Sequence, residues 1–196
     1  MNEEYIKNWL KENLTPDRYA HSVGTAGCAV ELAKKFGVNE KKAYIAGLLH
    51  DSAKCKTKKE MIDIVRHKLN DMDPMELNTE KILHAPVSAY VARDGFGVKD
   101  PDILSAIRWH TIGKPDMNNL EAIIFLADKI EPTRGNVEFR EKVLKILDEN
   151  PNEKGLKLGL FECYAQTIQS LAERELPIMP MTIDVYNDLL NFKNSL

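Results

Sequence analysis

The chain has 196 residues, of which 43% are hydrophobic and 29% charged, and its formal net charge is −3. This composition predicts an ordinary water-soluble globule with one substantial core, and it excludes a general electrostatic role on nucleic acids or membranes. Three scattered cysteines without a C-x-x-C pair argue against a disulfide framework or a thiolate zinc site, so we expect a reducing cytoplasm. The acidic N-terminus lacks a signal-peptide pattern, and no apolar run approaches the roughly 20 residues of a membrane span.

Each of the first predicted helices has a recognisable boundary. Thr15 followed by Pro16 provides a capping hydroxyl and a proline at the first helical position, and Gly37 ends the helix that starts there. Asn39 and Thr57 cap the next two helices. The predicted ranges are 4–12, 16–36, a third range that runs into His50-Asp51, and 58–68.

Prolines and glycines divide the second half of the chain. Residues 70–78 are predicted as a loop with at most one turn of helix, and a short helix follows over 79–83. Pro86 begins another helix, which Gly95 and Gly97 close. Further helices are predicted over 101–110, over 119–128 with Asn119 as its cap, over 137–147, over 156–173, and after Thr182 as a cap. Because no alternating strand pattern of useful length occurs, the predicted fold class is a single all-α bundle over residues 1–196.

An adjacent His50-Asp51 pair follows the apolar stretch of residues 43–49, and Lys54 stands one turn further on. At the end of a core helix an imidazole and a carboxylate are poorly solvated, and burying them without partners is costly. A metal ion is the partner that suits both groups. The alternative is a helix C-terminus at which the histidine interacts with the last carbonyl groups.

Further polar residues stand alone at or near the ends of apolar helical stretches, namely His21, His84, His110 and Asp128. Taken alone, His84 and His110 are each better explained as core histidines with hydrogen-bonded rings. His67, in contrast, lies in a charged and solvated surround. The combined set of four imidazoles and two carboxylates suits iron, manganese, nickel, cobalt or zinc better than magnesium. Six side chains are too many for one ion that keeps a place for substrate, and they suit two ions that share a bridge.

Cations follow the predicted ligands closely. Lys54 lies one turn beyond the pair, and Arg134 follows Asp128 by a loop, so both could reach phosphate oxygens, Arg134 as a two-pronged donor. The alternative for each is a surface cation. Lys129 neighbours Asp128 and is equally well explained by a pair with Glu131.

Thr111 and Gly113 follow His110 in a predicted loop. A hydroxyl and exposed amides there could bind a phosphate or a purine. The alternative is an ordinary loop with turn residues.

The order His…His-Asp…His…His…Asp resembles that of the HD superfamily of metal-dependent phosphohydrolases in its two-metal form. The flanking residues look like the bacterial symmetrical diadenosine-tetraphosphatase family (the YqeK type) from about Arg18 to Arg134. The motifs are His50-Asp51-x-x-Lys54, Leu83-His84-x-Pro86-Val87, Trp109-His110-Thr111-x-Gly113 and Ala127-Asp128-Lys129-Ile130-Glu131-Pro132-x-Arg134. Residues 137–196 carry no recognisable motif.

This resemblance implies an HD-domain helical bundle, with its motif-bearing core over about 18–134 and C-terminal helices over 137–196. It also implies two divalent transition-metal ions, most often iron, with manganese, cobalt, nickel or zinc as alternatives. The implied ligands are His21, His50, Asp51 and Asp128 for one ion, and the bridging Asp51 with His84 and His110 for the other. A hydroxide held between the ions would attack an inner phosphate of diadenosine tetraphosphate and release two ADP.

Further roles follow from the same resemblance. Asp51 and Lys54 are expected to be catalytic, and the expected substrate-binding residues are Lys54, His84, Thr111, Gly113 and Arg134. The expected partner is a small dinucleoside polyphosphate or nucleotide, with no nucleic acid and no membrane. The oligomeric state stays open, because the C-terminal amphipathic helices could complete the core as easily as form a homodimer.

Two alternatives remain. One is another HD phosphohydrolase, acting on nucleoside monophosphates or a cyclic nucleotide. The stretch 130–134 argues for the tetraphosphatase family, and the Gly-Tyr-Pro signature expected of a cyclic-dinucleotide phosphodiesterase is missing. The other is a nucleotide-binding regulatory module without turnover, although such degenerate domains usually lack ligands, and this chain keeps all six.

Overall fold

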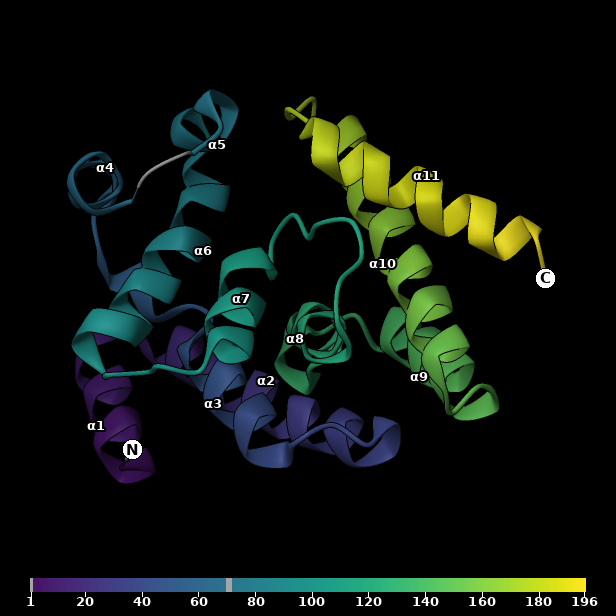
Figure 1. Ribbon diagram of the computed structural model, residues 1–196, viewed down its shortest axis with the longest axis horizontal. Helices are drawn as coiled ribbons and strands as arrows, with labels where there is room; N and C mark the ends of the chain where they lie inside the picture. Colours follow the sequence, from purple (N-terminus) through teal and green to yellow (C-terminus); the bar gives the residue numbers. More distant parts are fainter. Residues whose placement is uncertain (1, 70–71) are drawn as a thin grey trace.

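The computed structural model describes residues 2–69 and 72–196, and every regular element within these ranges is helical (Figure 1), as predicted. The helices are α1 (Glu3–Asn13), α2 (Pro16–Phe36), α3 (Glu40–Leu49), α4 (Lys58–Lys68), α5 (Pro74–Asn78), α6 (Glu80–Tyr90), α7 (Pro101–Trp109), α8 (Asn119–Ile130), α9 (Val137–Glu149), α10 (Glu153–Glu173) and α11 (Pro180–Asn194). Short turns between them are η1 (Ser52–Cys55), η2 (Val91–Gly95) and η3 (Pro132–Arg134). Of the predicted loop at 70–78, residues 70 and 71 lie outside the described part, and α5 forms near its end. In the described part of the chain no helix is long and apolar enough to cross a membrane.

Several predicted helix ends are confirmed by capping interactions. The Thr15 hydroxyl accepts a hydrogen bond from the backbone N–H of Arg18 at the start of α2, and Gly37 ends that helix with a φ of 67°. The Asn39 side chain caps α3 by accepting a bond of 3.0 Å from the Lys42 amide. These ends are readable from sequence because every group involved lies within one turn of the chain.

The predicted start of a new helix at Pro86 is wrong, because α6 passes through the proline without interruption. Proline removes one backbone donor and disfavours a helix interior. Here Leu83 and Val87 are fully buried in a small second core, which they share with Met61 and Val65 of α4. The burial of these side chains outweighs the local preference for a break.

Two predicted caps are also wrong. Asn118 caps α8 instead of Asn119, because its side chain and that of Glu121 bond reciprocally to each other's backbone N–H groups. Thr182 does not cap α11, since Pro180 already occupies the first helical position and Thr182 is buried inside the helix.

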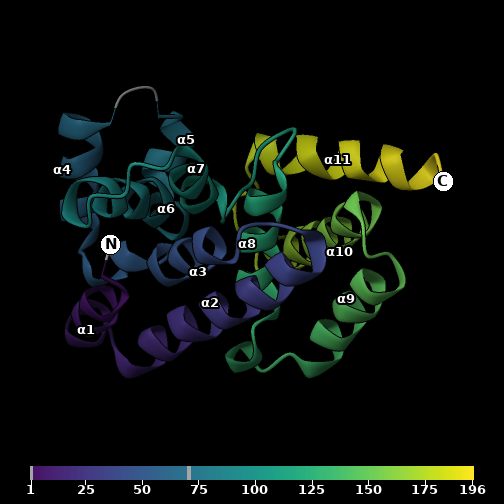
Figure 2. The ribbon, with the colours of Figure 1, turned by 60° about the horizontal axis from the view of Figure 1, so that its bottom comes forward.

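Helix α8 lies at the centre of the molecule, in contact with α2, α3, α7, α9 and α10 (Figure 2). Its middle is apolar on every side, and Ile123, Ile124, Phe125 and Leu126 are fully buried. A helix that is hydrophobic all round must be enclosed by other elements. The C-terminal helices supply part of this enclosure, since the rings of Phe125 and Tyr164 stack with centroids 4.7 Å apart. Helices α9 to α11 therefore complete the core.

A close approach between α2 and α3 brings the first two predicted ligands together. A Cβ atom on Gly47 would lie 2.7 Å from the Cα atom of Ala26, so only glycine fits at this crossing. The contact lies one turn before His50 on α3, and on α2 it lies five residues after His21. The two histidine rings consequently meet edge to face, with centroids 5.0 Å apart.

Candidate metal centre

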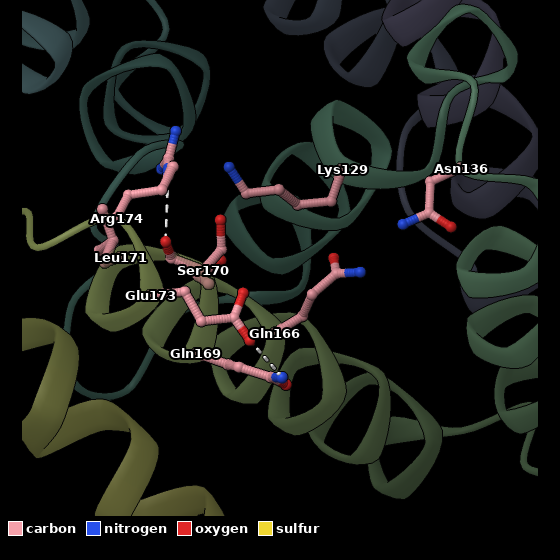
Figure 3. A pocket seen from close by; sticks show the side chains of 9 residues that line it. Lys129, Asn136, Gln166, Gln169, Ser170, Leu171, Glu173 and Arg174 are labelled. Carbon is pink, nitrogen blue, oxygen red and sulfur yellow. Dashed lines mark hydrogen bonds between the residues drawn. The ribbon is translucent and has the colours of Figure 1, made fainter.

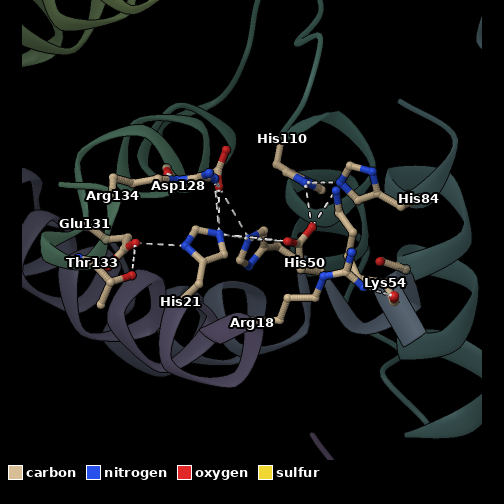
Figure 4. Close-up of polar contacts among 12 residues, drawn as sticks. Arg18, His21, His50, Lys54, His84, His110, Asp128, Glu131, Thr133 and Arg134 are labelled. Carbon is tan, nitrogen blue, oxygen red and sulfur yellow. Dashed lines mark hydrogen bonds and ion pairs between the residues drawn. The ribbon is translucent and has the colours of Figure 1, made fainter. Parts of the chain in front are cut away.

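The side chains of the six predicted metal ligands are buried and converge on one point of the bundle (Figure 4). They are His21 on α2, His50 and Asp51 just after α3, His84 on α6, His110 just after α7 and Asp128 near the end of α8. Asp51 has left the helical conformation, with φ −107° and ψ 15°, which lets two neighbouring side chains face the same point. His67 is exposed on α4, away from this group.

Asp51 lies at the middle of the group and presents one carboxylate oxygen to each side. Its Oδ1 is 3.0 Å from Nε2 of His84 and 3.6 Å from Nε2 of His110. Its Oδ2 faces the other pair, at 3.7 Å from Nε2 of His50 and 3.9 Å from Nε2 of His21. The carboxylate therefore stands between two pairs of imidazoles, which is the arrangement that a bridging ligand requires.

Asp128 contacts only one of the two pairs. Its Oδ1 is 3.0 Å from Nε2 of His21 and 3.5 Å from Nε2 of His50. Two sets of donor atoms result, and they share Asp51. One set is His21, His50, Asp51 and Asp128, and the other is Asp51, His84 and His110.

The hydrogen bonds of two imidazoles, His50 and His110, determine which ring nitrogen carries the proton. Nδ1 of His50 lies 2.7 Å from the carbonyl oxygen of Gly47, and Nδ1 of His110 lies 2.7 Å from that of Ile107. A carbonyl oxygen can only accept, so each Nδ1 donates. These rings thus satisfy the helix C-terminus and still leave Nε2 free as a ligand, so the two interpretations of the His50-Asp51 pair are compatible.

The free Nε2 atoms test whether the site suits a cation. Nε2 of His21 is 3.1 Å from Nε2 of His50, and Nε2 of His84 is 3.1 Å from Nε2 of His110. Lone pairs that face each other at this distance, beside two buried carboxylates, repel unless a positive charge lies among them. The donor set therefore fits divalent metal ions, as the composition of nitrogen and oxygen ligands indicates.

Protonation at neutral pH suits metal binding at Asp51, Asp128, His84 and His110. At His50 burial lowers the pKa, but the neighbouring carboxylates Asp51 and Asp128 outweigh burial and raise it, so a metal ion would displace a proton there. Burial raises the pKa values of Asp51 and Asp128, but nearby cationic groups and hydrogen bonds outweigh burial and hold both values well below the usual range. Burial lowers the pKa of His110 and lowers that of His84 to about 4. Charged carboxylates and neutral imidazoles are the forms that bind metals.

Glu131 orients His21, a role that the sequence did not reveal. Its carboxylate is only 1% exposed and accepts a hydrogen bond of 2.9 Å from Nδ1 of His21. The backbone N–H and the hydroxyl of Thr133 donate to the same carboxylate at 2.7 and 2.5 Å. A Cβ atom on Gly24 would collide with Glu131, so Gly24 keeps this space open. The alternative explanation of Lys129, a pair with Glu131, does not hold, because Lys129 pairs with Asp128 at 3.1 Å.

Two arginines hold the segments around the site. Arg134 donates from Nε to the backbone carbonyl of Asp128 at 2.7 Å, and its Nη2 contacts the Asp128 carboxylate and lies 3.2 Å from Nε2 of His21. Arg18 donates to the backbone carbonyl of Lys54. Burial lowers the pKa of Lys54, whose side chain lines the adjoining cavity.

The loop after His110 places its two predicted substrate-binding residues differently. Thr111 lines the cavity, and its hydroxyl is buried without a hydrogen-bond partner among the described residues. Gly113 has a φ of +69°, and the hydroxyl of Tyr164, which donates to the carbonyl of Ile112, occupies the space that a side chain there would need. Gly113 thus shapes the loop against α10 and is not part of the cavity lining.

A cavity of about 440 Å³, here called the central cavity, opens onto the metal centre. Asp51, His84, His110 and Asp128 form its floor. Its cationic side chains are Lys54, Lys81, Lys129, Arg134 and Arg174. The wall opposite the histidines comes from the end of α10 and the segment that follows, residues 167–182. No predicted site residue lies in this wall, because no local sequence motif marks it.

Comparisons with known proteins agree with this arrangement. The sequence profile of the HD domain matches residues 18–133. A Halalkalibacterium halodurans protein named symmetrical bis(5′-nucleosyl)-tetraphosphatase is 40% identical over 97% of this chain and 98% of its own. A Bacillus subtilis protein of the same name is 39% identical over 97% of this chain and 99% of its own.

A solved structure extends the likeness to the fold. It is a Clostridium acetobutylicum hydrolase of the HD superfamily, described as involved in NAD metabolism. It matches with a TM-score of 0.89 and 31% identity, over 97% of this chain and 98% of its own. The likeness therefore includes the C-terminal helices that the HD profile leaves out.

Proposed function

This chain belongs to the HD-domain family of hydrolases, among the symmetrical bis(5′-nucleosyl)-tetraphosphatases, and from that premise we propose that it cleaves diadenosine tetraphosphate to two ADP. The observation that carries the proposal is the position of Asp51 between two pairs of imidazoles. The basic lining of the central cavity supports it further, because a chain of four phosphates needs several cations to balance its charge.

The donor atoms support two metal ions. His21, His50, Asp51 and Asp128 would hold one, and Asp51, His84 and His110 would hold the other. Bound divalent ions supply an activated water and neutralise charge on a phosphoryl group. Iron is the metal we expect, and manganese, cobalt, nickel and zinc also suit these nitrogen and oxygen ligands.

The remaining residues bind and position the phosphate chain. Lys54 and Arg134 reach the central cavity from opposite sides of the metal centre, Lys54 as a point charge and Arg134 as a planar fork. The buried hydroxyl of Thr111 is available to donate to a phosphate oxygen or to the leaving group's bridging oxygen. In our proposal Nε2 of His84 binds the metal, and the edge of its ring lines the cavity.

Product analysis under anaerobic conditions tests this function, with Fe²⁺, Mn²⁺, Co²⁺ or Zn²⁺ added singly. We expect ADP as the only product from diadenosine tetraphosphate, and no product from Asp51→Ala, while the exposed His67→Ala variant behaves as wild type. ATP together with AMP would refute symmetrical cleavage. No cleavage with any metal would favour another nucleotide phosphohydrolase, with nucleoside monophosphates tested next, or a binding module.

The location and the partner follow from the same substrate. All three cysteines are free thiols, which suits a reducing compartment, and we place the enzyme in the cytoplasm. Its partner is a small dinucleoside polyphosphate. Neither assignment depends on the oligomeric state.

A further inference from the structure

The central cavity continues into a second cavity on the side of α10. This polar arm, about 520 Å³ in volume, is lined by Asn136, Gln166, Gln169, Ser170 and Glu173 together with residues that it shares with the central cavity. The shared residues are Lys129, Thr167, Leu171 and Arg174. The ammonium of Lys129 and the guanidinium of Arg174 lie on facing sides of the passage between the two cavities (Figure 3).

A third cavity adjoins the central one on the side of η1. This basic arm, about 650 Å³ in volume, is lined by Arg18, Lys54, Lys56 and Lys81 among other residues, and none of the described side chains in its lining is a carboxylate. It shares Lys54, Lys81 and His84 with the central cavity. Two arms thus extend from the metal centre, and each joins the central cavity between cationic side chains.

Arg174 is the cation at this junction to which the proposed reaction gives no other role. Its Nε donates to the backbone carbonyl of Ser170 at 3.0 Å, a local bond at the exposed end of α10. Among the side chains that the structure describes, which exclude those of residues 70, 71 and 80, no carboxylate forms an ion pair with it, whereas Lys129 and Arg134 both pair with Asp128. An exposed guanidinium on a cavity wall is suited to bind a phosphate.

The backbone directly after Arg174 adopts an unfavourable conformation that ends α10. Glu175 has a φ of 52°, a left-handed conformation that is unfavourable for a side chain other than glycine. The amide of Glu175 bonds to the carbonyl of Ala172 at 3.1 Å, and that of Leu176 bonds to the carbonyl of Leu171 at 2.9 Å. This pair of bonds closes the helix and turns the chain so that Arg174 faces the polar arm while Leu176 reaches the basic arm.

We propose that the polar arm and the basic arm each hold one nucleoside diphosphate half of the substrate, with Arg174 binding phosphate on the polar side and Lys81 on the basic side. The proposal rests on the proposed function. Cleavage at the middle of the chain leaves the same group on both sides of the reacting bond, so a symmetrical hydrolase needs a compartment on each side. The two arms provide these compartments, and the C-terminal segment forms the wall that joins them.

Steady-state kinetics of Arg174→Gln test the polar arm, with Arg66→Gln on the exposed face of α4 as the matched control. With diadenosine tetraphosphate we expect the variant to raise KM roughly tenfold, the loss of one charge-assisted contact, and to leave kcat within about twofold. Adenosine tetraphosphate also places two phosphates beside Arg174, so its KM should rise by a similar factor. A KM for diadenosine tetraphosphate within twofold of the wild-type value would overturn the assignment.

Lys81→Gln should likewise raise KM for diadenosine tetraphosphate, through the basic arm. The double variant should raise this KM more than either single variant does, because each side chain binds phosphate on its own side of the reacting bond. If the double variant raises KM no more than the single variants do, the two side chains do not act on opposite arms and the proposal fails.

Binding of ADP to the metal-loaded protein separates this inference from the proposed function. We expect equilibrium dialysis to give two ADP per chain, and one in Arg174→Gln and one in Lys81→Gln at the same ADP concentration. One ADP per wild-type chain that still makes ADP from diadenosine tetraphosphate would overturn the two arms and leave the function intact. Two ADP per chain without any hydrolysis would refute the function and leave two nucleotide sites.

Discussion

Gly24 and Glu131 determine together how His21 presents Nε2. A methyl group on Gly24 would displace the Glu131 carboxylate, whereas one on Gly27 would meet nothing within 4 Å. Loss of a partner that orients a metal ligand typically weakens metal binding about 10- to 100-fold. We therefore expect Gly24→Ala and Glu131→Gln to lose affinity in this range, measured by competition with a chromogenic chelator.

Gly27→Ala is the matched control for this prediction. It adds the same methyl group three residues further along α2, where no atom beyond the adjoining helix backbone lies within 4 Å of it. Because alanine favours the helix interior, unfolding should require about 0.5–1 kcal/mol more in this variant, and its metal affinity should stay at the wild-type value. Equal metal affinity in Gly24→Ala and Gly27→Ala would show that Glu131 does not support His21.

The cysteines should differ sharply in reactivity. Cys28 and Cys163 are buried, and burial raises the pKa of each thiol to about 12. Cys55 is exposed, although partial burial also raises its pKa. Since only the thiolate reacts, titration of the native protein with a disulfide reagent at pH 8 should modify one thiol, and all three after unfolding. Fast modification of a second thiol in the native protein would contradict the burial described here.

At the scale of helices, sequence predicts ends better than interruptions. Thr15, Gly37 and Asn39 act within a single turn, so the residues that decide the outcome are adjacent in the chain. Pro86 is different, because the packing of Leu83 and Val87 on α4 comes from residues about twenty positions away. No local pattern contains that information, and the local preference of proline therefore gives the wrong result.

The end of α10 allows a prediction about helix termination. Replacing Glu175 by glycine removes the unfavourable left-handed conformation, so we expect the free energy of unfolding to rise by roughly 0.5–1 kcal/mol, measured with urea. Glu173→Gly places the same residue inside the last turn, where it should lower that free energy by about 1 kcal/mol. If both variants change the free energy of unfolding in the same direction, this explanation of the turn is wrong.

At the scale of the whole molecule, sequence predicted the six side chains that the structure brings together but not the cavity above them. These side chains can be recognised in the sequence because each is a polar residue at or near the end of an apolar stretch, in an order that resembles a known family. Residues such as Arg174 and Leu176 reach the site only because α10 packs on α8 through Phe125 and Tyr164. That wall is a product of tertiary packing, and neither residue differs locally from an ordinary surface residue.

The metal centre also connects most of the bundle, because its ligands come from α2, α6, α7 and α8 and from the end of α3. Asp128 pairs with Lys129 and Arg134, but without ions the carboxylate of Asp51 has only imidazole nitrogens as partners among the described residues, and the converging Nε2 atoms face one another in a buried site. Ions that bind only the folded chain stabilise it in proportion to their binding free energy.

We therefore expect a strong chelator to lower the Tm of the wild-type protein by several degrees, recorded by circular dichroism, and each added divalent ion that binds to restore it. The exposed His67→Ala variant should show the same decrease. In His110→Ala the difference between the chelated and the metal-loaded protein should shrink, because one set of ligands is incomplete. A wild-type Tm that is equal with and without chelator would mean that these six side chains are balanced without ions, and the interpretation of the cluster as a metal centre would be wrong.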